Sequence, residues 1–175
     1  LNLAACAMVG YGLARFRFPG SGIIFGLAIF TLVVPPQLIM VPMYLNFRFF
    51  NLLGLLREPI NLIGTYWPFA LMSGTATGFR CGLYIFIMRQ FFRGMPKALE
   101  EAAYIDGAGL FTTFIRVMLP GAVPGLLVTF LFSFVWQWND YLYVTQFMPG
   151  QSFLPQALEG AANKVARAID EADAL

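Results

Sequence analysis

The stretch that decides the fold is Gly94-Met-Pro-Lys-Ala-Leu-Glu-Glu-Ala-Ala-Tyr-Ile-Asp-Gly-Ala-Gly109, a short charged segment in an otherwise apolar chain. Pro96 suits the beginning of a helix, because the N–H that it lacks would have no partner in the first turn. Glu100 and Glu101 are favoured near the positive N-terminal end of the same helix, and Gly107 is the expected left-handed stop. The stretch therefore predicts a short helix that ends at Gly107.

A second helix is expected directly after the first. Apolar side chains recur there at helical spacing, which predicts one face that packs on the rest of the protein. We therefore predict a two-helix element over residues 94–120, whose small side chains would allow another protein to approach closely. The alternative is an ordinary solvated loop with incidental alanines. The residues of the expected apolar face are Leu110, Phe111, Phe114, Ile115 and Met118.

The composition of the whole chain excludes several classes of protein. Of the 175 residues 59% are apolar and only 11% are charged, whereas a soluble domain carries about a quarter charged residues. The net charge of +2 is too small for a nucleic-acid-binding surface. Histidine is absent, which excludes Ser-His-Asp and Cys-His catalysis, and we expect no metal site. Cys6 and Cys81 lie in apolar stretches and predict small buried side chains rather than a disulfide framework or a redox motif.

Long uncharged runs predict membrane-spanning helices. Three runs of 30, 21 and 23 residues carry no charged side chain, and about 20 apolar residues suffice to cross a bilayer as a helix. We predict spans near residues 22–45, within residues 60–92 and at residues 122–138. Residues 1–14 are typical of the end of a further span, so we expect a piece of a longer polytopic protein. The alternative is a set of core helices in a large soluble protein.

Prolines interrupt the first of these spans. Pro35-Pro36 and Pro42 must kink or open the helix, because proline lacks an N–H and its ring clashes with the preceding turn. Such breaks are tolerated in a bilayer where other helices or a wet cavity satisfy the freed carbonyl groups. This favours a helix that lines a moving pathway over a passive anchor.

Small residues at positions 73–78 interrupt the second run. We expect an outer amphipathic helix at residues 61–72, then a turn, and then a span that enters near Phe79 and leaves near Phe92. One long kinked span over residues 60–92 is the alternative.

Basic residues orient the spans. Short loops rich in Lys and Arg tend to stay in the cytoplasm, and two such loops are separated by two spans, so both are expected inside. Residues 47–61 and everything after Asn139 then lie outside. Residues 156–175 have the pattern of an amphipathic helix that lies on the outer surface or meets a binding protein. The basic residues of the two inner loops are Arg15, Arg17, Arg89, Arg93, Lys97 and Arg116.

One spaced motif resembles a known family. Glu101-Ala102-Ala103, then Gly107 after three residues, then Val117-Met-Leu119-Pro120 after nine more, resembles the EAA signature of permease subunits of binding-protein-dependent ABC importers. That signature usually has Ile where Val117 stands here. The resemblance covers about residues 10–160 of the printed sequence. Segments that resemble the carbohydrate-uptake branch, the sister subunit type of maltose-like transporters, are Arg89-Gln-Phe-Phe-Arg93, Ile105-Asp-Gly-Ala108, Arg15-Phe-Arg-Phe-Pro19 and Trp136-Gln-Trp-Asn-Asp140.

The resemblance implies an all-α, polytopic transmembrane bundle of the MetI-like permease type. The printed residues would correspond to the end of the second span through the fifth, without the first and last spans. A single permease domain would occupy residues 1–175, with a cytoplasmic EAA coupling loop at 94–120 and an external segment at 139–175. The implied location is the bacterial plasma (inner) membrane. The implied partners are ABC ATPase subunits, a second permease subunit, an external solute-binding protein, a sugar-like substrate and the lipid bilayer, with no nucleic acid.

The resemblance also implies a division of labour with an ATPase. The EAA element resembles the coupling helix that docks in a cleft of the ATPase subunit. The printed sequence has no G-x-x-x-x-G-K-[ST] phosphate loop, so we expect no catalytic residue and no cofactor on this chain, with ATP and Mg on the partner ATPase. Helix capping and solvation are the alternative roles of the acidic groups. The implied ATPase-coupling residues are Glu101, Ala102, Ala103, Asp106, Gly107, Leu119 and Pro120.

Aromatic and polar residues end the last apolar run and form a candidate substrate pathway. Aromatic faces can cover the apolar face of a sugar, while amide and carboxylate groups bind its hydroxyls. An aromatic belt at the membrane interface requires the same residue types at the same depth, and it is the favoured alternative. The residues concerned are Trp136, Trp138, Asn139 and Asp140.

Two other functional classes compete with a permease. An intramembrane enzyme of the aspartyl type would need two neighbouring carboxylates, but Asp106 and Asp140 are a span's length apart. A gated channel or a secondary transporter would account for the broken spans but not for the EAA stretch. A sugar, glycerol phosphate, an oligosaccharide or a polyol would each fit as the solute.

Overall fold

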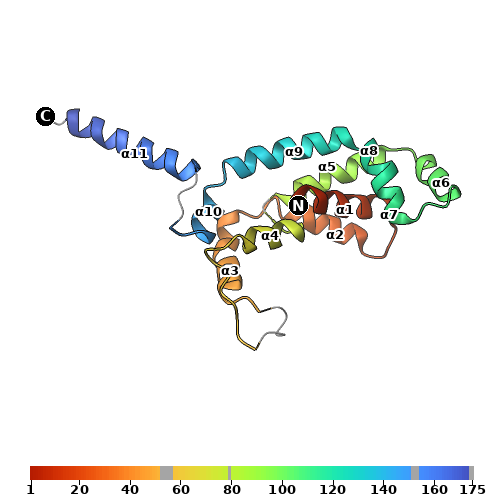
Figure 1. The fold of residues 1–175 in the computed structure, drawn as a ribbon, viewed down its shortest axis with the longest axis horizontal. Helices are drawn as coiled ribbons and strands as arrows, with labels where there is room; N and C mark the ends of the chain where they lie inside the picture. The colour runs from red at the N-terminus through yellow and green to blue at the C-terminus, as the bar shows by residue number, and fades with distance from the viewer. Residues whose placement is uncertain (52–56, 79, 151–153, 174–175) are drawn as a thin grey trace. The chain divides into compact units, whose positions relative to one another are not determined.

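The computed structural model is almost entirely helical (Figure 1). The residues that it describes are 1–51, 57–78, 80–150 and 154–173. Among these residues, extended pairing is limited to one antiparallel bridge between Phe50 and Ile60. The prediction of an all-α protein is therefore confirmed.

The chain divides into two compact units. The first consists of Leu1–Ile39 and Phe69–Phe134, and the second of Met40–Pro68 and Val135–Leu175. Helices α3 (Pro36–Arg48), α4 (Trp67–Gly74) and α9 (Val123–Trp138) each have residues in both units. The other helices of the first unit are α1 (Asn2–Arg15), α2 (Ser21–Phe30), α5 (Cys81–Gly94), α6 (Ala98–Ile105), α7 (Leu110–Thr113) and α8 (Leu119–Gly121), with a π-helical turn at Phe114–Met118.

Close packing of α1 against α5 forms the centre of the first unit. A Cβ atom on Gly10 would lie 2.8 Å from Met88 Cβ and 3.1 Å from the backbone nitrogen of Arg89. Gly82 of α5 in turn faces the backbone carbonyl of Ala28 in α2, where a side chain would collide. Small residues thus let three helices approach one another almost backbone to backbone.

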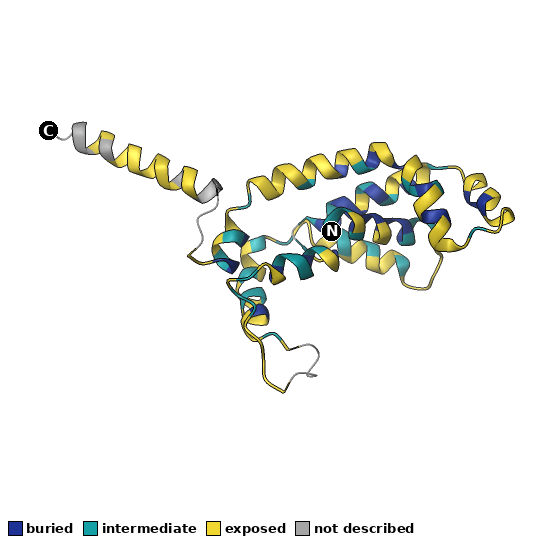
Figure 2. Ribbon diagram, viewed as in Figure 1, coloured by how far each residue is buried: buried dark blue, intermediate teal, exposed yellow. Residues whose placement is uncertain are grey.

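A cluster of large buried side chains joins this centre to the predicted two-helix element. The Tyr11 ring lies 5.3 Å from the Phe92 ring and 4.9 Å from the Phe114 ring, measured between centroids. Met88 and Met118 are fully buried in the same cluster. Figure 2 shows buried residues along α1 and α5, whereas most of α9 is exposed. The element that follows α5 is therefore attached to the helical core by apolar packing.

The second unit has its own small core. The Phe47 ring packs edge-on against Phe147 of α10 (Leu142–Phe147) at 5.4 Å, and the backbone N–H of Gly64 donates to the carbonyl of Phe147 at 2.7 Å. The predicted amphipathic tail forms α11 (Leu154–Asp173), which is confirmed as a helix. Its apolar side chains Leu158 and Val165 are exposed.

The expected spans are shorter or more broken than the sequence predicts. No single described helix is both long enough and apolar enough to cross a bilayer. The two helical stretches Leu110–Gly121 and Val123–Trp138 meet both requirements when taken together, with a bend of 78° between them. The expected break in the first span is confirmed, since α2 ends at Phe30 and α3 begins at Pro36. Pro42 lies inside α3, which is not opened there, and a kink at Pro42 stays a prediction.

The prediction of a helix over residues 61–72 is wrong for its first half, because α4 begins only at Trp67. Polar residues hold the preceding segment in turns. The Asn61 side chain accepts the backbone N–H of Ile63 at 3.0 Å, and Gly64 has a φ of +83°, so a helix cannot form there. The predicted entry point of the next span, Phe79, lies outside the described residues.

Candidate functional site

The predicted short helix of residues 94–109 is present as α6. It begins at Ala98, so Pro96 stands just ahead of it rather than in its first turn. Gly107 has a φ of +80°, its N–H donates to the carbonyl of Tyr104 at 3.0 Å, and the N–H of Ala108 donates to Ala103 at 2.9 Å. This is the left-handed helix stop that the sequence predicts.

The second predicted helix is less regular than expected. It starts after Gly109 as α7 and continues through the π-helical turn into α8. Phe114 and Met118 are buried, but Leu110, Phe111 and Ile115 are exposed, so the prediction that all five form a packed face is wrong. Only a narrow stripe of a helix can face a core, and Phe114 and Met118, four residues apart, occupy it.

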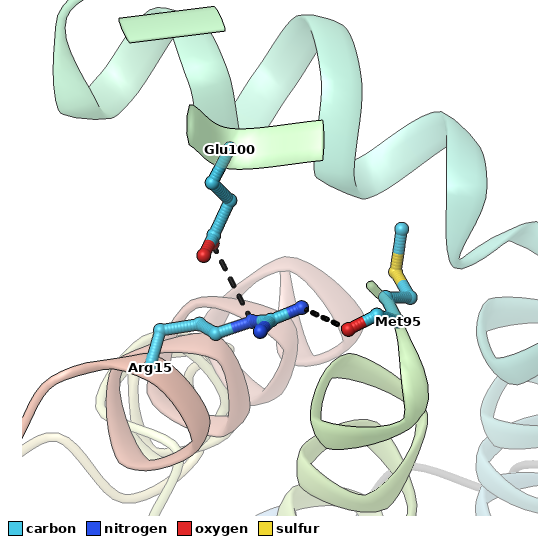
Figure 3. A network of polar contacts seen from close by, with 3 residues as sticks. All are labelled: Arg15, Met95 and Glu100. Carbon is cyan, nitrogen blue, oxygen red and sulfur yellow. Dashed lines mark hydrogen bonds and ion pairs between the residues drawn. The ribbon is translucent and has the colours of Figure 1, made fainter. Parts of the chain in front are cut away.

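A buried ion pair connects α6 to the end of α1 (Figure 3). Arg15 Nε lies 3.4 Å from Glu100 Oε1, and Arg15 Nη2 donates to the backbone carbonyl of Met95 at 2.7 Å. The two charged side chains are only 6% and 11% exposed. This pair was not predicted from the sequence. The apolar residues beside each charge indicate only that a buried charge there needs a partner, not which residue that partner is.

The predicted coupling residues fall into an outward and an inward group. Glu101, Ala102, Asp106 and Gly107 are exposed, together with Pro120. Ala103 of α6 is buried. Leu119 is partly buried and packs against the apolar cluster. The apolar side chains that α6 also exposes, and that the sequence analysis did not select, are Leu99, Tyr104 and Ile105, with Ile105 86% exposed.

The candidate substrate-pathway residues lie at the junction of α9 and α10. Trp136 and Trp138 are exposed near the end of α9. The Asn139 amide donates to the carbonyl of Val135 at 2.7 Å, and Asp140 Oδ1 accepts the backbone N–H of Tyr143 at 3.1 Å. The two polar side chains therefore cap the adjoining helix ends, and their contact with a substrate stays a prediction.

Asp140→Asn is expected to stabilise the chain at neutral pH. Burial raises the pKa of Asp140 above its ordinary value, so the folded chain favours the neutral carboxyl group. The stability that the neutral Asp140 carboxyl group contributes is complete below the ordinary carboxyl pKa, near 4. It is lost as the pH rises through the raised pKa of the folded chain. An amide carries no charge to desolvate and keeps the oxygen that accepts the Tyr143 N–H.

Thermal unfolding of the unmodified chain and of the variant, in detergent at about pH 4 and about pH 7, measures this effect. The lower pH is chosen near the ordinary pKa of a carboxyl group. The Asn variant should gain most at the higher pH. Asp140→Ala, which loses the cap, should cost about 1 kcal/mol at the lower pH. Equal losses for both variants at neutral pH would contradict the assigned burial of the charge.

Two further clusters in the first unit were not selected from the sequence as sites. The break between α2 and α3 holds a small pocket lined by residues 31–36 and Arg80, whose φ of +63° is unusual for a residue with a side chain. Cys6 and Cys81 are both buried, as predicted, and both thiols contact Asn2 Oδ1, at 3.3 and 3.2 Å. Within the described residues no three Cys, Asp or Glu side chains gather in a metal-binding arrangement.

One protein-family model matches most of the chain, including α6 and the buried ion pair. The model for the "Binding-protein-dependent transport system inner membrane component" family matches residues 7–166. The chain belongs to this family. Its members are inner membrane components, so membership places the chain among membrane proteins and confirms the resemblance drawn from the EAA signature.

Three curated relatives of this permease family member are named for the uptake of sugars. The diacetylchitobiose uptake system permease protein NgcG of Streptomyces coelicolor is 39% identical over 136 residues, 78% of this chain and 41% of the relative. The trehalose transport system permease protein SugB of Mycobacterium tuberculosis is 34% identical over 136 residues, 78% of this chain and 45% of the relative. The alpha-glucoside transport system permease protein AglG of Rhizobium meliloti is 32% identical over 153 residues, which are 85% of this chain and 37% of the relative.

A solved structure has the same fold. A chain of a bacterial ABC transporter involved in the import of the acidic polysaccharide alginate aligns with a TM-score of 0.65, at 23% identity, over 90% of this chain and 55% of that chain. The chain spans less than half the length of the curated relatives described here. The MetI-like permease fold is thus confirmed for the residues present.

Proposed function

We propose that this permease family member is a membrane-spanning subunit of an ATP-driven importer and forms part of the pathway for a sugar or a related solute. It acts through α6, which serves as the coupling helix that meets the ATPase. The observation that carries the proposal is the combination of a short helix fixed at both ends and an exposed surface of acidic and apolar side chains on that helix.

The physical requirements of a coupling helix agree with this arrangement. A helix that transmits force must keep its orientation relative to the helices it moves, and α6 is fixed by the left-handed Gly107 at one end and by the Met95 carbonyl contact near the other. It must also offer a surface that another protein can bury. Ile105 and Tyr104 provide apolar area, and Glu101 provides a charge.

The proposed assembly contains ATPase subunits, a second permease subunit and an external solute-binding protein, in a bacterial inner membrane. ATP and Mg bind to the ATPase, and this chain supplies no catalytic group. Residues 94–120 face the cytoplasm in this arrangement, and residues 139–175 face the outside. Family membership and the missing phosphate loop support this division.

We propose a carbohydrate as the solute, because the relatives NgcG, SugB and AglG are named for sugars. Trp136 and Trp138 are exposed and can cover a sugar ring, so they are the proposed contacts on this chain. The test is uptake of a labelled sugar into proteoliposomes, with an oligosaccharide, glycerol phosphate or a polyol added as an unlabelled competitor. We expect the oligosaccharide to reduce this uptake and glycerol phosphate to leave it unchanged.

Glu101→Lys is expected to weaken the docking of the ATPase. The exposed carboxylate is proposed to pair with a basic group of the ATPase, and reversal of its charge replaces attraction by repulsion. Coupling between two sites is typically worth 1–3 kcal/mol, so ATP-driven uptake should fall about tenfold. Uptake into proteoliposomes and co-purification of the ATPase subunit with the full-length permease measure the effect.

Glu58→Lys is the matched control, because Glu58 is also exposed but lies in the segment proposed to be outside. It should leave the amount of co-purified ATPase unchanged. Normal uptake and normal ATPase retention by the Glu101→Lys variant would contradict the docking role of Glu101. Failure of the unmodified permease to retain any ATPase would contradict the proposed function itself.

A further inference from the structure

The two adjacent carboxylates of α6 have different environments. Glu101 is exposed, whereas Glu100 is buried and points toward Arg15 at the end of α1 (Figure 3). The proposed docking of the ATPase uses only the outward one. The inward ion pair therefore has a separate role that the docking surface does not explain.

We propose that Arg15 and Glu100 form a clamp that makes α1 and α6 move as one body, so that displacement of the coupling helix is passed directly to α1. The proposal rests on the proposed function and adds the residues through which this chain transmits the movement. Arg15 and Glu100 are positioning residues, since neither is required to touch the solute or the ATPase.

The packing of α6 shows why an ion pair is needed. The helix has only eight residues, and isolated helices shorter than about 12–15 residues are marginal in water. Its first residue is preceded by Lys97, which makes no side-chain cap. Of its eight residues only Glu100 and Ala103 are buried. Glu100 is therefore the one large side chain of α6 that is buried.

The geometry of Arg15 fixes two segments at once. Its Nε faces Glu100 Oε1 at 3.4 Å, while Nη2 donates to the Met95 carbonyl, at the point where α5 gives way to the loop. The planar guanidinium group holds these two directions rigidly relative to each other. A lysine in its place could satisfy one partner but not both in this geometry.

The apolar cluster ensures that the clamp moves α1 and not only a side chain. Tyr11, one turn before Arg15, is buried and packs against the rings of both Phe92 and Phe114. Arg15 therefore extends from a part of α1 that cannot rotate freely. A displacement of α6 reaches α1 through a short path of buried contacts.

Charge exchange in the complete transporter tests the clamp. Glu100→Gln, which keeps the shape and removes the charge, and Arg15→Glu should each lower the solute transported per ATP hydrolysed by about tenfold. ATPase retention should remain, because the outward surface of α6 is unaltered. The double variant with Arg15→Glu and Glu100→Arg should recover at least half of the coupling ratio.

Arg17→Glu is the matched control, since Arg17 lies two residues beyond Arg15 and is exposed. It should keep the normal ratio of transport to hydrolysis. Normal coupling in Glu100→Gln, or no recovery in the double variant that inserts and retains ATPase, would overturn the clamp. Either result leaves the proposed function intact, because that function fails only if the unmodified permease neither retains ATPase nor supports ATP-driven uptake.

Discussion

Replacing Gly107 by proline is expected to reduce ATP-driven uptake by about a hundredfold, because a proline in an incompatible conformation costs about 3 kcal/mol or more. Gly107 has a φ of +80°, whereas proline requires about −65°. Proline also lacks the N–H that Gly107 donates to the Tyr104 carbonyl. The end of α6 would therefore unwind, and the orientation of the coupling helix would be lost.

Uptake into proteoliposomes, with the amount of inserted permease measured in parallel, tests this effect. Insertion should be normal, because Gly107 lies outside the apolar runs. Gly109→Ala is the control: Gly109 has an ordinary φ of −74°, and an added Cβ would meet no atom within 4 Å. Equal uptake by the Gly107→Pro and Gly109→Ala variants would show that the helix stop has no part in coupling.

Gly10→Val is expected to destabilise the helical core strongly, because Gly10 lies where α1 packs against α5. The first added carbon would lie 2.8 Å from Met88 Cβ and 3.1 Å from the backbone nitrogen of Arg89. A backbone atom cannot move aside as a flexible side chain can, so α1 must shift away from α5. Overpacking of this kind typically costs about 1–3 kcal/mol, and we expect the upper end of that range.

Thermal unfolding of the purified permease in detergent measures this loss. Gly12→Val is the matched control on the same helix, because the nearest atom to its added Cβ would be a ring carbon of Phe16 at 3.9 Å. Its unfolding temperature should stay within the error of the unmodified protein. Similar losses for both variants would mean that α1 and α5 do not pack at Gly10.

The sequence predicted best those features that depend on local chemistry. Gly107 stops α6 because only glycine adopts its backbone conformation readily, and this requirement is visible from the sequence alone. The break after Phe30 follows from Pro35 and Pro36 in the same way. Local rules were less reliable where polar turns compete with a helix, as at Asn61 and Gly64, so that α4 begins later than expected.

The long-range contacts were not predictable from one sequence. Arg15 and Glu100 are 85 positions apart in the chain, and nothing local says that the first will face the second rather than Glu101. Helical periodicity offered both Phe111 and Phe114 as packing residues, and only the tertiary structure places Phe114 inward. The sequence thus predicted the short helix that is proposed to dock, whereas the contacts that attach this helix to α1 became visible only in the fold.

The π-helical turn at Phe114–Met118 gives the spacing of the family signature a rotational meaning. Each residue of an α-helix advances the chain by about 100° around the axis, and a π-turn absorbs one extra residue in a single turn. The number of residues in the continuous helical stretch Leu110–Gly121 therefore sets the direction in which the chain enters the bend before α9. One residue more or fewer in this stretch would rotate the helical residues that follow it by about 100°, so that a different face of the stretch would meet its neighbours.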